Sequence, residues 1–382
     1  MLSREREEVP EAPRVLIATT GLSGRGGTDF YARDLAIALL RFGWLPVVYS
    51  TQPGPVADEL RRATIPVVRH LDDCLAQPDI IHGQHTVETL AALSRFPQVP
   101  AVFVCHDAIN WHSIPPAAPQ IRAYVAVDRN CRDRMMFEHG IPEASIRVLT
   151  NSVDLQRFTQ RPPLPSVPRR AVVFSNAARE NTWVAPIRAA CTRRGIELDV
   201  IGESSGRFVA RPEETLREYD VVFAKARCAL EALAVGTSVI VCDHAGFAGM
   251  VTTRNRALLQ QLNFGARTLQ HPITAENVLE ALGQYDPADA AAVSQSIRST
   301  SGSDVRAADL IALYEEILAS PTDVSASDVL LATSRSLERL LPHLYRSKPP
   351  SKVRAIAGTL ANVKALALPV RLLHRLRRWA RR

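Results

Sequence analysis

A single acidic residue, Glu231, lies within the otherwise apolar stretch 229–235. These apolar neighbours predict a helix that is buried on most sides. A carboxylate in such a place is costly unless it accepts hydrogen bonds, which a pair of hydroxyl groups or a nearby basic side chain can supply. The residue type and its surroundings therefore indicate either a carboxylate that binds a diol or one that is neutralised within the chain.

Two basic residues, Lys225 and Arg227, come directly before this helix, where a predicted strand ends. A helix N-terminus carries about half a positive charge, and two cations beside it favour the binding of a diphosphate. The alternative is a pair of solvated loop residues. The pattern predicts an anion site just upstream of Glu231.

A glycine-rich loop near the N-terminus offers a second anion site. Apolar residues at helical spacing predict that a helix starts near Thr28, and the preceding loop contains Gly21, Gly24, Gly26 and Gly27. Glycines allow the backbone to approach a ligand, and a helix start offers free N–H groups. The alternative is a tight turn without a ligand.

This loop does not match the two common nucleotide-binding loops. Gly27 stands where the phosphate-loop pattern requires lysine, and the full G-x-G-x-x-G dinucleotide pattern is absent. Neither a nucleoside triphosphatase nor a dehydrogenase is therefore favoured. Asp29, in the first turn of the helix, is either a site residue or a helix cap, because Asp is preferred near helix starts.

Short apolar runs alternate with helical stretches from about residue 13 onward, which predicts an α/β fold with doubly wound sheets. Several runs are apolar on both faces, as is typical of parallel strands covered by helices. The predicted strands are Arg14–Thr20, Pro46–Thr51, Asp79–Gln84, Ala101–His106, Tyr124–Asp128, Ser145–Asn151, Ala171–Ala177, Glu197–Glu203, Asp220–Lys225 and Ser238–Asp243. Late helices are predicted over 304–319 and 323–345.

The segment 159–170 holds four prolines and is predicted to be a linker. It separates an N-terminal Rossmann-like domain, 1–158, from a second one, 171–320, and a helical basic tail, 321–382, follows. Two such domains form a cleft, and ligands bind beyond the carboxyl ends of the strands. His106 ends an apolar strand, so we expect it at this cleft.

Five segments, in order, resemble motifs of the GT-B glycosyltransferases of the family 4 type. Together they span roughly residues 14–320. They are GRGGTDFYARDLAIALLRFGWLPVVYST at 24–51, PDIIHGQHTVETLAAL at 78–93, VFVCHD at 102–107, RVLTNSVDLQRF at 147–158 and LEALAVGTSVIVCD at 230–243. The resemblance implies two Rossmann-like domains that face each other across a cleft.

The resemblance also implies roles for individual residues. Glu231 matches the glutamate that binds the ribose of the nucleotide, and His106 matches a histidine that contacts the donor sugar. Asp29 occupies a position near the acceptor. His82 and His85 belong to or follow the predicted strand 79–84, which neighbours the strand of His106, and are expected on the acceptor side. The residues expected to bind the donor are Gly26, Gly27, Asn176, Arg179, Lys225, Arg227 and Glu231.

The implied reaction is transfer of a sugar from a UDP- or GDP-sugar to a glycan or glycolipid acceptor of the cell surface. Enzymes of this fold generally stabilise the departing diphosphate with basic side chains and helix ends. The sequence has no Asp-x-Asp motif, which the metal-using GT-A class requires. We therefore expect no metal and no cofactor other than the donor itself.

Two segments depart from the family pattern. The family carries a second glutamate eight residues before the ribose-binding one, near the transferred sugar, and Phe223 stands at that position. The phosphate-binding segment that opens the second domain is replaced by FSNAARENTW at 174–183, where Asn176 and Arg179 are the candidate substitutes. Donor sugar and stereochemical course stay open.

The formal charge of +7 is concentrated at the C-terminus, where residues 346–382 hold eleven basic and no acidic side chains. Subtracting these eleven charges leaves −4 for the first 345 residues, which argues against a nucleic-acid partner. An apolar stripe in 351–382 and Trp379, close to the C-terminus, suit an anionic membrane surface. The alternatives are a solvated tail or a helix docked on the body of the chain.

The sequence contains no apolar stretch long enough to span a bilayer and no apolar N-terminal leader, so we expect a cytoplasmic protein. If the basic tail binds a membrane, the protein lies on its inner face. Three functions stay open. The leading one is a glycosyltransferase. The others are a sugar-nucleotide epimerase and a catalytically degenerate GT-B protein that binds nucleotide or glycan as a partner.

Overall fold

The computed structural model describes residues 12–24, 26–74, 76–180, 182–207, 209, 211–320 and 323–346. The described residues up to Thr333 form one compact unit, and those from Ser334 onward form a second. The predicted basic helix of the tail, 351–382, lies outside the described residues. None of the described helices is long and apolar enough to cross a membrane.

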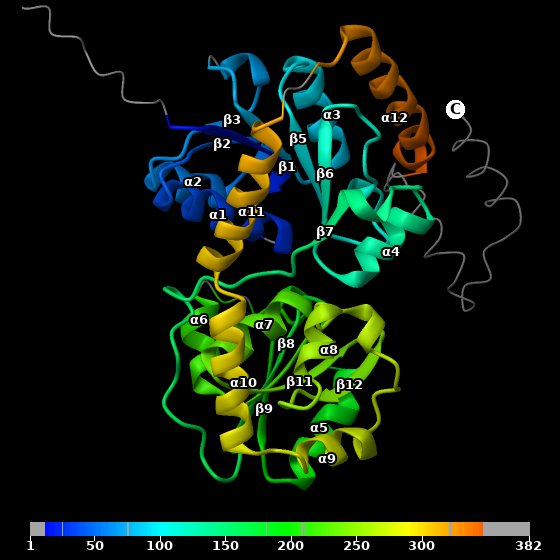
Figure 1. Cartoon of the computed structure of the whole chain (residues 1–382). Helices are drawn as coiled ribbons and strands as arrows, with labels where there is room; N and C mark the ends of the chain where they lie inside the picture. Colours follow the sequence, from blue (N-terminus) through cyan, green and yellow to red (C-terminus); the bar gives the residue numbers. More distant parts are fainter. Residues whose placement is uncertain are drawn as a thin grey trace, which may run out of the picture. The chain divides into compact units, whose positions relative to one another are not determined.

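The first sheet has seven parallel strands in the order β3-β2-β1-β4-β5-β6-β7 (Figure 1). The strands are β1 Arg14–Leu22, β2 Leu45–Pro53, β3 Val67–Val68, β4 Ile80–Gly83, β5 Ala101–Cys105, β6 Ile121–Ala126 and β7 Ile146–Val148. The helices between them are α1 Gly27–Arg41, α2 Pro55–Arg62, α3 Thr86–Arg95 and α4 Arg129–Phe137. Parallel neighbours bring the carboxyl ends of the strands to one edge.

The second sheet has five strands in the order β12-β11-β10-β8-β9, all parallel except β12. Its strands are β8 Arg170–Phe174, β9 Glu197–Ile201, β10 Val221–Ala224, β11 Ser238–Asp243 and β12 Gly246–Met250. The α-helices from β8 onward are α5 Val184–Arg193, α6 Pro212–Thr215, α7 Ala226–Val235, α8 Arg256–Gln261, α9 Ala275–Leu282, α10 Pro287–Thr300, α11 Ser303–Leu318 and α12 Ala326–Arg346.

Short 3₁₀ helices complete the loops of the described chain. They are η1 Leu71–Asp73, η2 Trp111–Ser113, η3 Glu143–Ser145, η4 Glu203–Ser205, η5 Leu216–Glu218 and η6 Ala266–Thr268. The turn η4 follows β9 and contributes to a pocket described below.

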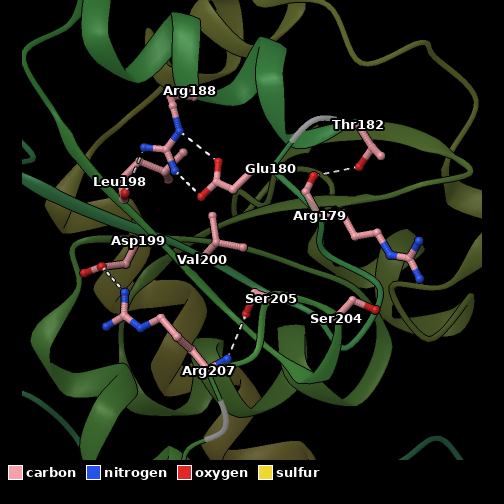
Figure 2. A pocket seen from close by; sticks show the side chains of 10 residues that line it. All are labelled: Arg179, Glu180, Thr182, Arg188, Leu198, Asp199, Val200, Ser204, Ser205 and Arg207. Atoms are coloured by element: carbon pink, nitrogen blue, oxygen red, sulfur yellow. Dashed lines mark hydrogen bonds and ion pairs between the residues drawn. The ribbon is translucent and has the colours of Figure 1, made fainter.

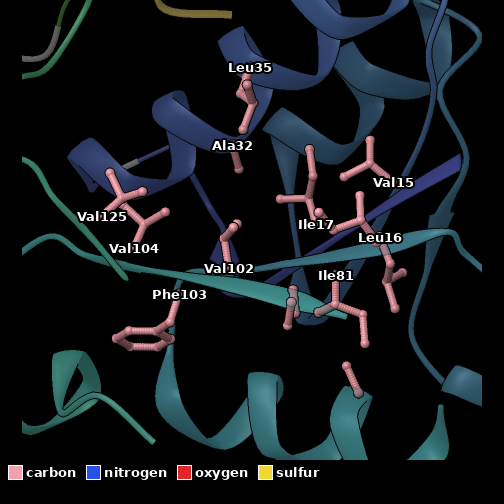
Figure 3. Packing of buried hydrophobic residues seen from close by; sticks show 14 of the residues in the cluster. Val15, Leu16, Ile17, Ala32, Leu35, Ile81, Val102, Phe103, Val104 and Val125 are labelled. Carbon is pink, nitrogen blue, oxygen red and sulfur yellow. The ribbon is translucent and has the colours of Figure 1, made fainter. Parts of the chain in front are cut away.

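Central strands of the first sheet are buried on both faces, as their apolar sequences predict. Val15, Leu16 and Ile17 are successive residues of β1, and all three are fully buried. Figure 3 shows them among side chains of β4, β5 and α1. All ten predicted strands are present in the structure.

The sequence prediction omits two strands, β3 and β12. β3 is only two residues long, which is too short to show a hydrophobic period. β12 has the sequence GFAGM and pairs antiparallel with β11 after a two-residue turn. Two glycines in five residues weaken any strand pattern, because glycine is depleted in strands.

The helices that follow the second sheet pack on different cores. Val293 and Ile297 of α10 belong to the core of the second sheet, whereas Leu310 and Tyr314 of α11 belong to that of the first. α11 lies beside α1 (Figure 1). The chain thus returns to the first sheet after completing the second, and both predicted late helices are confirmed as α11 and α12.

Candidate functional site

Lys225 and Arg227 flank a sharp turn between β10 and α7. Ala226, the first residue of α7, has a φ of 51°. This left-handed conformation costs a non-glycine residue about 1–2 kcal/mol. The Ala226 N–H donates to the carbonyl of Phe264 at 3.0 Å, which holds the turn in place. Backbone conformations of this kind concentrate at functional sites.

Glu231 is buried in α7 and is paired within its own helix. The Arg227 Nε donates to Glu231 Oε1 at 2.7 Å, and Arg227 Nη2 donates to Asp34 of α1. The Arg227 and Glu231 side chains are 13% and 10% exposed. The sequence left two alternatives for Glu231, and in the structure a basic side chain neutralises it.

Asp34 connects this ion pair to further charges on α1 and α2. Asp34 Oδ1 accepts from Arg33 Nε at 2.8 Å and from Arg33 Nη2 at 2.7 Å. Arg33 Nη1 in turn donates to Glu59 at 3.0 Å. Three of the five charges in this network, Asp34, Arg33 and Glu231, are buried, and the Arg227 side chain is only 13% exposed. Buried charges persist only when paired in this way.

Burial and charge act differently on the two carboxyl groups that share Arg227. Burial raises the pKa of Glu231, and the Arg227 charge opposes that rise only in part. Burial alone would also raise the pKa of Asp34, but Arg227 and Arg33 together lower it below its ordinary value. Asp34 is therefore the more firmly ionised partner, because it has two cations.

Lys225 also has a carboxylate partner. Its ammonium group forms an ion pair with Asp243, at the end of β11, and His244 contacts the same carboxylate. The Lys225 side chain is 32% exposed, whereas that of Asp243 is 5% exposed. Lys225 therefore keeps access to solvent that Arg227 has largely lost.

The glycine loop is fixed by Asp29, the third residue of α1. Its carboxylate accepts hydrogen bonds from the hydroxyl of Ser23 at 3.0 Å and from the Gly24 N–H at 2.9 Å. A Cβ at Gly26 would come within 3.3 Å of the same carboxylate. Asp29 is buried, so in this structure it binds the loop that contains Gly26 and Gly27.

Replacement of Asp29 by alanine should lower the free energy of unfolding by about 1–2 kcal/mol, because two hydrogen bonds at a helix start are lost. Urea denaturation at neutral pH measures this. Asp58→Ala is the matched control, since Asp58 occupies the first turn of α2 but is exposed. Its effect should stay below about 0.5 kcal/mol, and equal losses for the two variants would contradict the role of Asp29.

Asn176 and Arg179 follow β8 and lie beside the edge strand β9. Asn176 Oδ1 accepts from the backbone N–H of Glu203 at 3.3 Å, which joins the loop after β8 to the loop after β9. Arg179 lines a pocket of about 580 Å³ with Glu180, Thr182, Arg188, Leu198, Asp199, Val200, Ser204, Ser205 and Arg207. Figure 2 shows the Arg179 side chain extending away from the Glu180–Arg188 pair.

The other charged residues of this pocket form two ion pairs. Arg188 donates to Glu180 at 2.6 and 3.0 Å, and Arg207 donates to Asp199 at 2.6 Å (Figure 2). Lys225, Arg227 and Glu231 do not line it. Since β10, β8 and β9 are neighbours, the ends of β10 and β9 are two strand spacings, about 10 Å, apart.

Histidine and tyrosine side chains cluster at the carboxyl ends of β4 and β5. The Tyr31 ring stacks on His82 at 6.0 Å and meets His106 edge-on at 4.5 Å. His82 Nδ1 contacts the Tyr314 hydroxyl at 2.6 Å, and His85 Nδ1 accepts from the Thr20 N–H at 3.1 Å. The structure thus brings His82 and His106 together around Tyr31.

Several buried polar atoms of this cluster have no hydrogen-bond partner in the described part of the chain. They are the Nε2 atoms of His82 and His106 and both amide atoms of Gln84, which is fully buried at the end of β4. Burial keeps the pKa of His106 well below its ordinary value, so its ring is neutral at physiological pH. A neutral Nε2 can exchange a hydrogen bond with a sugar hydroxyl.

The buried histidines should make stability fall in acid. Burial lowers the pKa of His82 to about 3 and that of His85 to about 4, whereas the unfolded chain binds these protons near pH 6.5. Their contribution is complete above pH 6.5 and is lost progressively as pH falls towards 4, by at most about 1.4 kcal/mol per pH unit for each histidine.

Urea denaturation at pH 7, 6 and 5 measures this loss, and His82→Asn should show a shallower pH slope than the unmodified chain. Asn keeps a polar group beside Tyr314 but does not titrate in this range. Identical slopes would mean that His82 takes up its proton in the folded state as readily as in the unfolded one.

The sequence reasoning missed Asp34 and Asp243, which hold Arg227 and Lys225. For Asp34 the spacing carried a usable signal, because it falls on the same helical face as Tyr31, Leu35 and Ala38. A carboxylate on an apolar helical face requires a cation from elsewhere. Asp243 follows an apolar strand, yet nothing local to it identifies Lys225 as its partner.

Part of the chain matches one family model, and many solved structures are similar to the chain. Residues 25–157 match the family model "Glycosyltransferase Family 4". No curated protein sequence matches the chain. A glycosyltransferase from Rickettsia africae ESF-5 has a TM-score of 0.58 at 13% sequence identity, over 80% of this chain and 99% of that one.

Two further solved structures are similar. Anabaena Alr3699/HepE, in complex with UDP and glucose, has a TM-score of 0.56 at 14% identity, over 80% of this chain and 100% of that one. A putative UDP-N-acetylglucosamine 2-epimerase from Listeria monocytogenes has a TM-score of 0.48 at 15% identity, over 82% and 100%. The similarity to the Rickettsia and Anabaena structures shows that this chain has the GT-B glycosyltransferase fold. It is a divergent protein of that fold, similar to glycosyltransferase family 4 over residues 25–157.

Proposed function

We propose that the protein transfers a sugar from a UDP- or GDP-sugar to a glycan or glycolipid acceptor. The observation that carries the proposal is Glu231, a buried carboxylate in the helix that starts at the carboxyl end of β10, with Lys225 at that start. Ligands of doubly wound sheets bind at this edge. The similar Anabaena protein was crystallised with UDP and glucose, which supports a nucleotide donor.

The leaving diphosphate needs positive charge during sugar transfer. Lys225 and the free N–H groups at the start of α7 supply it, since a helix N-terminus is a ready anion site. Lys225 is the better placed cation because it is partly exposed and pairs with one buried carboxylate, Asp243. Binding would exchange Asp243 for a phosphate oxygen, and no metal is needed in this scheme.

The remaining donor-binding residues lie around this centre in the proposal. Gly26 and Gly27, at the start of α1, would approach the donor through their backbone. Asn176 and Arg179, after β8, would replace the phosphate-binding segment of the family, and within the described part of the chain the Arg179 guanidinium forms no ion pair that a donor would have to displace. His106, which is half-buried directly after β5, would contact the transferred sugar.

Calorimetric titration with UDP, GDP and ADP, followed by assays of sugar release, tests this function. We expect one of the first two to bind at micromolar concentration and the corresponding nucleotide sugar to be consumed faster when an acceptor glycan is added. Absence of binding by every nucleotide would contradict both enzyme hypotheses. Interconversion of donor sugars without an acceptor would instead identify an epimerase.

A degenerate, non-catalytic protein is the second candidate, and Phe223 favours it. This side chain is fully buried in β10 at the position where the family carries the glutamate near the transferred sugar. The same titration separates the candidates. Tight nucleotide binding with no release of sugar from any donor would support a binding partner and contradict the transferase.

We also propose that the basic segment 346–382 places the protein on the inner face of an anionic membrane. Its eleven basic residues would each contribute about 1 kcal/mol near such a surface. Co-sedimentation of the full chain with phosphatidylserine vesicles should therefore be strong at low salt and weak at high salt. Equal sedimentation with neutral vesicles would contradict an electrostatic contact.

A further inference from the structure

Arg227 is committed to protein partners in a way that Lys225 is not. Its Nε and Nη2 donate to Glu231 and Asp34, and its guanidinium lies 5.7 Å from the centre of the Phe30 ring. The same ring also lies 4.8 Å from the Arg33 guanidinium. Arg227 is thus bound on several sides by groups of α1 and α7, although it is the second residue of a helix start.

The position of Glu231 shows what these contacts of Arg227 mean for the site. Glu231 is four residues along α7 from Arg227, so the guanidinium that bonds to it is held one turn into the helix. A diphosphate at the helix start would instead meet the N–H groups of the first turn and Lys225. The geometry therefore directs Arg227 towards the carboxylate and away from the phosphate position.

We propose that Arg227 is a positioning residue that holds the Glu231 carboxylate for the ribose of the donor, and that Asp34 of α1 fixes Arg227 in this orientation. The inference rests on the proposed function and changes one of its details, because Arg227 then orients the ribose contact and does not bind the diphosphate. Asp34, absent from the sequence-based site, becomes part of the nucleotide-binding machinery.

The hydrogen-bonding capacity of Glu231 fits this role. Arg227 donates to Oε1, and none of the described residues donates a hydrogen bond to Oε2. A carboxylate held by one oxygen can accept from a hydroxyl with the other, and a cation at its side keeps it ionised. Asp34 is held in turn by two bonds from Arg33, which restrains the whole chain of contacts.

The test compares the affinities for UDP and 2′-deoxy-UDP, or the GDP pair if GDP is preferred, in the full chain. The unmodified chain should bind the ribonucleotide at least tenfold more tightly. Arg227→Gln should lose most of this preference, as Glu231→Gln does, and Asp34→Asn should reduce it at least threefold. Lys225→Ala should lower the affinity for both nucleotides about equally and leave the preference for the ribonucleotide intact.

A double variant identifies the route by which Asp34 acts. Because Asp34 works through Arg227, the pair Asp34→Asn with Arg227→Gln should lose no more preference than Arg227→Gln alone. Asp58→Asn, an exposed carboxylate of α2 paired with Arg61, is the matched control and should change nothing. Thermal melts establish that each variant is folded.

If Arg227→Gln does not fold, Arg227→Lys replaces it, since it keeps the buried charge but cannot contact both carboxylates; its preference should fall at least threefold. An Arg227 variant that lowers the affinity for both nucleotides equally would overturn the inference and indicate that Arg227 is a phosphate ligand. In that case the proposed function would stand, because Glu231→Gln would still remove the ribose preference. If the unmodified chain binds neither nucleotide, both the inference and the proposed function are contradicted.

Discussion

Glu231→Gln should lower the affinity of the protein for its nucleoside diphosphate about 100-fold. Glutamine keeps the size of the side chain but replaces the charged carboxylate, whose oxygens accept hydrogen bonds from the ribose, with a neutral amide. Hydrogen bonds to charged groups are worth about 1.5–3 kcal/mol each, and a loss near 3 kcal/mol corresponds to about 100-fold. Calorimetric titration at neutral pH measures the change directly.

The matched control is Glu276→Gln. Glu276 lies in the first turn of α9, is exposed and pairs with Arg193 at 3.5 Å. Its replacement should leave nucleotide affinity within about twofold of the unmodified value, since exposed ion pairs contribute little. A Glu231 variant that binds as tightly as the control would show that Glu231 has only a structural role, which its pairing with Arg227 would then explain.

Phe223→Glu should destabilise the fold by about 4 kcal/mol or more. The substitution places a glutamate at the position that the motif resemblance assigns to the first glutamate of family 4, and in this chain Phe223 is a fully buried residue of β10. The variant loses the packing of a large aromatic side chain and buries a carboxylate without a partner. Urea denaturation at neutral pH measures the loss.

Phe223→Leu is the companion variant. It keeps an apolar side chain in the strand, so its cost should be nearer 1 kcal/mol. A Phe223→Glu variant as stable as Phe223→Leu would mean that the new carboxylate reaches solvent or a cation. It would also mean that the local structure differs from the one described.

The fold could be predicted from the sequence because its central strands are apolar on both faces and regularly spaced. Each of β1, β5 and β11 contains a run of at least four residues from Val, Ile, Leu, Phe, Ala and Cys, and these runs are buried in the structure. A buried parallel strand must have such a sequence. The omitted strands lacked it, because one is two residues long and the other is rich in glycine.

The candidate site was less predictable because its partners come from distant segments. The sequence placed Lys225 and Arg227 before a buried helix that carries Glu231, and the structure has that helix with Glu231 buried. It gave no means of pairing Arg227 with Asp34, which lies 193 residues earlier in the chain. Ion pairs have no sequence period, so only the fold can identify them.

Asp29 illustrates a different limit. A carboxylate three residues into a helix can bind a ligand or its own loop, and residue type alone does not separate the two uses. The structure places Ser23 and Gly24 against it, so the carboxylate binds its own loop. This contact gives the glycine loop a defined shape before any donor binds.

The most direct test of the account is a crystal structure of the protein with its preferred nucleoside diphosphate. The account predicts ribose hydroxyl groups within about 2.6–3.2 Å of the Glu231 carboxylate and the diphosphate at Lys225 and the first turn of α7. A nucleotide bound elsewhere, with Glu231 contacting only Arg227, would contradict it.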